Sequence, residues 1–117
     1  MIVALHSVLR PGAVDDYRVE HAAIPAGLDA AFARVGIHGW TIWRSGERLF
    51  HVVDCDDFDA AIAALDDDPA NVAWQASIGR WVEVFRDADG QDGFAPLEQV
   101  WSLAAQRAGT AVTPGRG

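Results

Sequence analysis

Cysteine is almost absent from this 117-residue chain, in which Cys55 is the only one. A single cysteine excludes a disulfide within the chain and a thiolate cluster for a metal, and it fits a reducing compartment. Basic residues are also scarce, because 9 Lys and Arg stand against 17 Asp and Glu for a net charge of −8. Such an acidic surface is not steered toward phosphate groups. We therefore expect neither nucleic acid nor an anionic membrane as a partner.

The sequence also lacks a segment that would target or span a membrane. The apolar opening at residues 2–9 is short, contains His6 and Ser7, and has no basic region before it. Half of the chain is hydrophobic and 22% is charged, which is typical of one globular domain. The sequence therefore predicts a cytoplasmic, globular protein.

Several common functional motifs are missing as well. We find no Gly-rich phosphate loop, no nucleophile elbow, no His-x-x-x-His pair and no calcium loop. The acidic run 66–68 could suggest a metal, but Asp68 followed by Pro69 fits an ordinary helix start much better. We expect no metal site.

Turn residues divide the chain into elements of split βαβ order. The predicted strands are 2–9, 38–44, 49–55 and 97–103, and the predicted helices are 14–35, 58–65 and a third from Pro69. This β-α-β-β-α-β order predicts an antiparallel sheet with helices on one face. We expect one domain over residues 1–103, a disordered tail over 104–117, and a homodimer that covers the open sheet face.

The first predicted helix carries two polar groups in its apolar stripe. Tyr17 and His21 are four residues apart, so they share a face with Val14 and Leu28. Pro25 should break the helix, because its ring clashes with the carbonyl group of His21. His21 would then lie at a helix C-terminus, where the dipole favours the protonated imidazole. Imidazole and phenol are a plausible acid/base couple, although a pair buried in the core is an equally open reading.

The remaining histidines are weaker candidates. His6 and His51 lie on predicted strands and fit ordinary sheet positions, and His38 opens a strand. Tryptophan is plentiful, and its flat ring suits the apolar face of a small molecule such as a sugar. The five are Trp40, Trp43, Trp74, Trp81 and Trp101. We expect Trp81 and Trp101, in apolar periodic positions, to lie in the core.

Taken in order, these motifs resemble those of the L-rhamnose mutarotases. They are the Tyr-x-x-x-His helix start at 17–21, the strand GIHGWTIW at 36–43, the Asn-x-x-Trp of 71–74 and the closing PLEQVWSL at 96–103. The resemblance implies a dimeric, ferredoxin-like α+β fold and interconversion of the α and β anomers of L-rhamnose without a cofactor.

The resemblance also implies roles for single residues. The family's catalytic histidine, a proton donor, falls on His21, and its substrate-contacting tyrosine falls on Tyr17, which would hydrogen-bond the histidine or serve as a second acid/base group. Further sugar contacts fall on Trp40 and Trp74.

The sequence departs from the family pattern at two places. Ala73-Trp74 stands where some members have a Trp pair, and residues 25–28 lack a Trp found beside the catalytic turn. The sequence therefore leaves the identity of the sugar open, with L-rhamnose, L-fucose and another deoxysugar as candidates. A cofactor-free monooxygenase and a non-catalytic sugar-binding module are the alternative functions.

Overall fold

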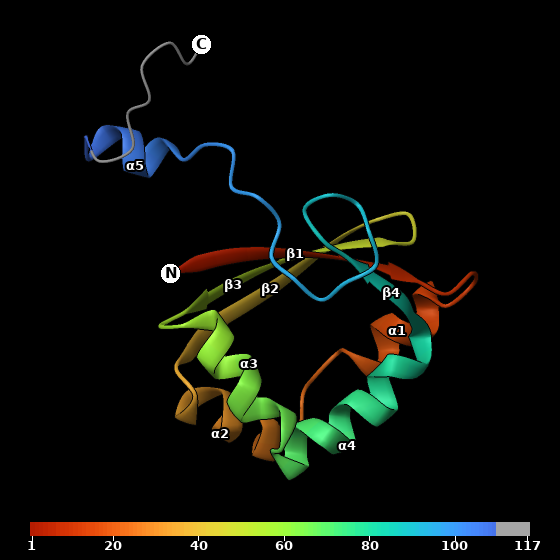
Figure 1. The fold of residues 1–117 in the computed structure, drawn as a ribbon. Helices are drawn as coiled ribbons and strands as arrows, with labels where there is room; N and C mark the ends of the chain where they lie inside the picture. The colour runs from red at the N-terminus through yellow and green to blue at the C-terminus, as the bar shows by residue number, and fades with distance from the viewer. Residues whose placement is uncertain (110–117) are drawn as a thin grey trace.

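A four-stranded antiparallel sheet with strand order β2-β3-β1-β4 forms the centre of the computed structural model, which describes residues 1–109. The strands are β1 (Ile2–Leu9), β2 (Ile37–Ser45), β3 (Arg48–Cys55) and β4 (Val82–Arg86). Figure 1 shows one face covered by α1 (Val14–Glu20), α2 (Ala26–Arg34), α3 (Phe58–Asp66) and α4 (Pro69–Ile78). The predicted element order and the one-sided helical layer are confirmed.

The predicted break at Pro25 is present. α1 ends at Glu20, and His21 caps it with its backbone N–H bonded to the carbonyl oxygen of Tyr17 at 2.9 Å. α2 starts directly after Pro25, whose φ of −62° suits the position before a first helical turn. The break places His21 at the junction between the two helices.

The start of α4 also follows the prediction. The Asp68 carboxylate accepts hydrogen bonds from the backbone N–H groups of Ala70 (2.9 Å) and Asn71 (3.4 Å), and Pro69 occupies the first turn. Asn71 donates its side-chain amide to the carbonyl oxygen of Leu65 at 3.0 Å, which ties the end of α3 to α4. These contacts fix the helix that carries Trp74.

The prediction of a last strand over 97–103 is wrong. β4 instead follows the 3₁₀ turn η1 (Gly79–Trp81) at once and pairs with β1 from His6 to Leu9. Because β4 occupies that part of the β1 edge, the later segment reaches only its far end, where the Leu97 N–H donates to the carbonyl oxygen of Ala4 (2.8 Å). The alternation in residues 97–103 therefore has no strand to pair with over its length.

The C-terminal part differs from the prediction in a second way. A short helix, α5 (Leu103–Arg107), forms in the segment that we expected to be without regular structure, and it stands away from the body in Figure 1. Residues 110–117, to which the rest of that prediction applies, lie outside the described residues. No helix among residues 1–109 is long and apolar enough to cross a membrane.

Two hydrophobic clusters lie between the sheet and the helices. The first cluster consists of Val3, Leu5, Ala31, Ile37, Val53, Cys55, Phe58, Ala61 and Leu65. The second cluster consists of Leu9, Ala13, Tyr17, Leu28, Leu49, Trp74 and Ile78. Burial of this apolar surface provides the main driving force for folding.

Candidate active site

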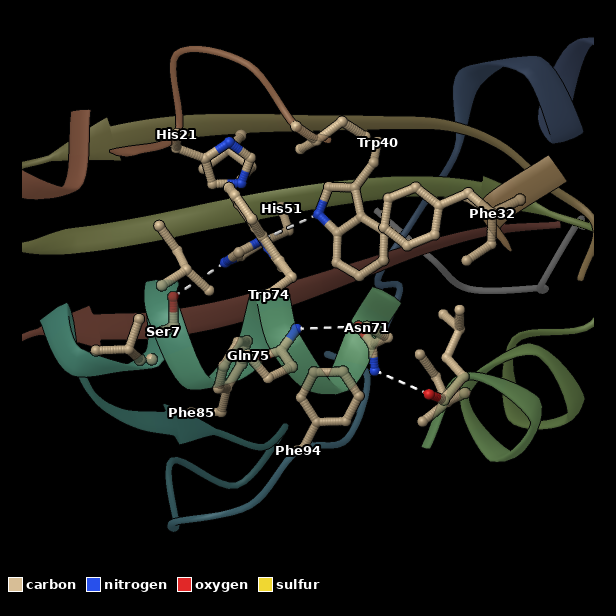
Figure 2. A pocket seen from close by; sticks show the side chains of 18 of the residues that line it. Ser7, His21, Phe32, Trp40, His51, Asn71, Trp74, Gln75, Phe85 and Phe94 are labelled. Carbon is tan, nitrogen blue, oxygen red and sulfur yellow. Dashed lines mark hydrogen bonds between the residues drawn. The ribbon is translucent and has the colours of Figure 1, made fainter. Parts of the chain in front are cut away.

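A cavity of about 840 Å³ lies between the sheet and the helical layer. Residues from all four strands and from α1 to α4 line it. Figure 2 shows aromatic side chains such as Phe32, Trp40 and Trp74 around it, together with polar ones such as Ser7 and Asn71. Such a volume and such a lining are typical of sites for small organic molecules.

The cavity lies where the two hydrophobic clusters meet. On β1, Ser7 stands between Leu5 of the first cluster and Leu9 of the second. On β3, His51 stands between the clusters in the same way. Both side chains are buried, and both line the cavity. Each of these two strands therefore carries a single polar side chain on its inward face.

The helical wall of the cavity carries the two residues that the sequence singled out first. Tyr17 and His21 both line it, with ring centroids 5.4 Å apart and planes tilted by 46°. Within the described residues, neither side chain makes a hydrogen bond to the protein. The phenol and the imidazole therefore face the cavity with their polar atoms uncommitted.

Tyr17 is a poor base in this position. Its side chain is buried, and that burial raises the pKa of the phenol to about 12 because ionisation in an apolar surrounding is costly. At neutral pH the phenol is therefore protonated and can donate a hydrogen bond. This suits a donor to a ligand oxygen rather than an acceptor of a proton.

Glu20 fixes the end of α1 beside His21. Its carboxylate accepts hydrogen bonds from the Ser77 hydroxyl (2.9 Å), the Arg80 guanidinium (2.7 Å) and the Trp81 indole N–H (3.2 Å). These bonds, the one from Trp81 foremost, lower the pKa of Glu20. The last turn of α1 is thereby tied to the end of α4 and to η1.

Both tryptophans predicted to contact a ligand also line the cavity. Trp74 comes from α4, is 9% exposed, and meets the His21 ring edge-on, with centroids 5.1 Å apart at 86°. Trp40 comes from β2 and stacks on Phe32 with centroids 5.7 Å apart at 19°. The structure thus brings all four predicted site residues to one cavity, on its helical wall and on its sheet wall.

A hydrogen-bond chain that the sequence did not predict crosses the sheet wall. The Trp40 indole N–H donates to Nδ1 of His51 at 3.1 Å, and Nε2 of His51 lies 2.9 Å from Oγ of Ser7. Figure 2 shows both bonds. Burial, together with the nearby His21 and His6, lowers the pKa of His51 to about 4, so its imidazole is neutral at physiological pH.

The sequence did hold a signal for this chain of bonds. Inward positions on β1 and β3 are apolar except at Ser7 and His51. In the sequence alone His51 fits an ordinary strand position and Ser7 has no visible partner, because pairing of the two requires the register of β1 on β3. That register sets Leu5 opposite His51 and Ser7 opposite Leu49.

The other two histidines lie outside this arrangement. His38 is exposed at the cavity edge and pairs with the Asp56 carboxylate at 2.8 Å. His6 lies on the opposite face of the sheet, stacked on Phe50 with centroids 4.9 Å apart. Neither contacts Tyr17 or His21.

Of the two tryptophans predicted to lie in the core, Trp81 packs against it and Trp101 does not. Trp81 is partly buried and packs against the second cluster, as expected. Trp101 is 56% exposed, so its predicted place in the core is wrong. It bonds to the Gln106 side chain of α5 at 2.9 Å instead, because its segment never joins the sheet. Trp43, on the open sheet face, is exposed too.

The acidic run behaves as a helix start. The Asp68 carboxylate also pairs with Arg34 at 2.8 Å, and these contacts with the N-cap bonds lower its pKa despite partial burial. Within residues 1–109, no group of three or more His, Cys, Asp and Glu side chains is arranged to hold a metal ion.

The fold is that of a ferredoxin-like α+β domain, with a cavity between its sheet and its helices that aromatic side chains help to line. A model of the L-rhamnose mutarotase family matches residues 2–103. The chain belongs to this family of isomerases. No curated protein matches the sequence.

Solved structures support the same fold. The L-rhamnose mutarotase of Formosa agariphila has a TM-score of 0.69 at 17% identity, covering 88% of this chain and 98% of that one. Tetracenomycin F2 cyclase of Streptomyces glaucescens, a type II polyketide cyclase, has a TM-score of 0.61 at 13% identity, covering 88% and 96%. A putative antibiotic biosynthesis monooxygenase of Bordetella bronchiseptica reaches 0.53 at 22%, covering 73% and 88%. Identities this low show a common fold and leave function to the site itself.

Proposed function

We propose that this chain interconverts the α and β anomers of a deoxysugar, with L-rhamnose as the first candidate, without a cofactor. One observation carries the proposal: the uncommitted imidazole of His21 lies on a cavity together with Tyr17, Trp74 and Trp40. Membership of the L-rhamnose mutarotase family supports the choice of reaction and sugar.

The reaction requires only the movement of protons. The anomeric hydroxyl gives its proton to a water molecule while the ring oxygen takes one from an acidic side chain, so that the bond from C1 to the ring oxygen breaks and an aldehyde forms. Rotation about C1–C2 and the reverse transfers close the ring on the other face. We assign donation of the proton at the ring oxygen to His21, since a positioned acid/base group accelerates such a step by about 10²–10⁴-fold.

Tyr17 would act beside His21 as a hydrogen-bond donor. The burial that raises the pKa of its phenol to about 12 keeps the proton on the oxygen throughout the physiological range. The phenol would therefore hold a sugar oxygen in place, while His21 exchanges the proton.

Trp40 and Trp74 would hold the sugar from two walls. Sugars have apolar C–H faces, and indole rings offer flat apolar surfaces that match them. Trp74 lies against His21 on the helical wall, and Trp40 lies on the sheet wall. A sugar between them would have its ring within reach of the helical polar groups.

We also propose that two copies of the chain associate through the open face of the sheet. The helices cover the other face, and this face exposes Ile2, Trp43 and Phe50, which are 60%, 57% and 38% exposed. Apolar side chains grouped on an uncovered sheet face favour association.

The direct test is anomer exchange followed by magnetisation-transfer NMR on L-rhamnose, L-fucose and other deoxysugars. The proposal predicts faster exchange with at least one of these sugars than in buffer alone. Exchange no faster than buffer across the panel would contradict it. If the sugars then quench tryptophan fluorescence, the chain is a binding module, and if it consumes oxygen with a quinol substrate, it is a monooxygenase.

A further inference from the structure

The chain of hydrogen bonds on the sheet wall has a fixed direction. The indole N–H of Trp40 can only donate, so Nδ1 of His51 must accept at 3.1 Å. A neutral imidazole that accepts at Nδ1 carries its proton on Nε2, which therefore donates to Oγ of Ser7 at 2.9 Å. Trp40, which can only donate, thus fixes the tautomer of His51, and the Ser7 hydroxyl accepts from the remaining N–H of the imidazole.

This chain of hydrogen bonds also runs from the interior of the protein toward the cavity. Ser7 is completely buried, His51 is 4% exposed, and Trp40 is only partly buried at the cavity. Trp40 is the only member of the three with a large surface to offer a ligand. Ser7 and His51 line the cavity as well, but both are buried, so we expect them to act on a ligand through Trp40.

The Trp40 ring is held in a second way. Phe32 of α2 stacks on it with centroids 5.7 Å apart at 19°, so the sheet and the helical layer both restrain the indole (Figure 2). A stack alone allows the indole to slide or turn in its plane, whereas a directional N–H bond fixes the turn. The two restraints together leave a single ring position.

We expect folding not to require this polar pair. The neighbouring inward positions of β1 and β3 carry apolar side chains such as Leu5, Leu9, Leu49 and Val53. Replacing both partners of a buried hydrogen bond by apolar groups of similar shape is nearly neutral for stability. The presence of a serine and a histidine between the clusters indicates a functional role at the cavity.

We propose that Ser7 and His51 are positioning residues that hold the Trp40 indole as a preformed platform for the apolar face of the sugar. This inference rests on the proposed function for the identity of the ligand. Its physical basis is preorganisation: a side chain that is already ordered pays no further entropy when the ligand binds. The effect falls on ground-state binding, because Trp40 does not take part in proton transfer.

The first experiment reads the hydrogen-bond chain without any sugar. In ¹⁵N NMR of the wild-type protein, we expect Nδ1 of His51 to be unprotonated and Nε2 to be protonated, with a slowly exchanging Trp40 indole proton. In His51→Leu, the indole proton should exchange rapidly. A wild-type His51 protonated on Nδ1, or a Trp40 indole proton that exchanges equally fast in both proteins, would overturn the inference.

The second experiment separates KM from kcat in L-rhamnose anomer exchange. If the restraint on the Trp40 side chain is lost, KM should rise about three- to tenfold and kcat should not change. We expect this of His51→Leu, a smaller rise for Ser7→Ala, and recovery in His51→Asn, whose amide oxygen can accept from Trp40. Ser45→Ala, at the exposed end of β2, is the matched control.

The outcomes distinguish this inference from the proposed function. If the wild-type protein does not accelerate exchange, the proposed function fails, while the NMR measurement still decides the state of His51. If the wild type accelerates exchange and His51→Leu has the wild-type KM, the positioning role is wrong. A His51→Leu variant that loses kcat instead of KM would equally contradict it.

Discussion

The rings of His21 and Tyr17 lie one helical turn apart with centroids 5.4 Å from each other, and no hydrogen bond joins them. Of the two roles that we expected for Tyr17, that of a hydrogen-bonding partner of the histidine has no such bond in this structure, and both roles stay predictions. The absence of that bond leaves the phenol free to bind a ligand oxygen directly. The two groups share a cavity, and we propose that they act on a ligand from neighbouring positions.

Tyr17→Phe isolates the phenol oxygen. The ring keeps its place in the second cluster, so stability should change little. The lost hydrogen bond to the sugar should lower kcat/KM for anomer exchange by about tenfold. Magnetisation-transfer NMR measures the rate. A variant with the wild-type kcat/KM would exclude a direct contact between the phenol and the sugar.

Acid should destabilise the protein through His51. Its pKa is about 4 in the folded state and 6.5 in the unfolded chain, so below pH 6.5 the unfolded state binds a proton that the folded state does not. The contribution of His51 to the free energy of unfolding is complete above pH 6.5 and is lost between pH 6.5 and 4. The loss from pH 7 to pH 4.5 should be about 2–3 kcal/mol.

Denaturant unfolding of the wild type and of His51→Leu at both pH values isolates this contribution. All other groups are the same in both proteins, including His21 and His6, which lie near enough to affect His51. The variant should therefore lose about 2–3 kcal/mol less on acidification. Equal losses in the two proteins would show that His51 titrates normally.

A charged substitution on the open sheet face tests the proposed dimer interface. Trp43 is 57% exposed on that face, and an aspartate there would place a charge inside a dimer interface. We expect Trp43→Asp to be monomeric in analytical ultracentrifugation, where the wild type is a dimer. Val72→Asp is the control, since Val72 is 54% exposed on α4 in the helical layer and should leave the dimer intact. A monomeric wild type would refute the proposed association.

Local sequence signals predicted the helical side of the molecule well. Pro25 marks the break after His21, and Asp68 with Pro69 marks the start of α4, because each acts on its own neighbours in the chain. Helical spacing then placed Tyr17, His21 and Trp74 on surfaces that meet at the cavity. The residues of the helical wall could therefore be predicted before the structure was known.

The sheet side depended on pairing between distant residues. The alternation in residues 97–103 is as regular as that of a strand, yet β4 occupies much of the β1 edge and leaves Trp101 exposed. Ser7 and His51 are 44 positions apart, and only the register of β1 on β3 brings them together. A period-two pattern predicts which face of the sheet a side chain lies on, but it does not predict which residue of the neighbouring strand lies beside it.

The most direct measurement is the rate of L-rhamnose anomer exchange with the wild type and with His21→Ala, followed by magnetisation-transfer NMR. Circular dichroism and the unfolding midpoint should show that the variant is folded, because His21 lies at a helix end and outside both clusters. We predict that the wild type accelerates exchange and that His21→Ala loses about 10²–10⁴-fold of the acceleration. A folded His21→Ala that exchanges the anomers as fast as the wild type would contradict the assignment of His21 as the proton donor.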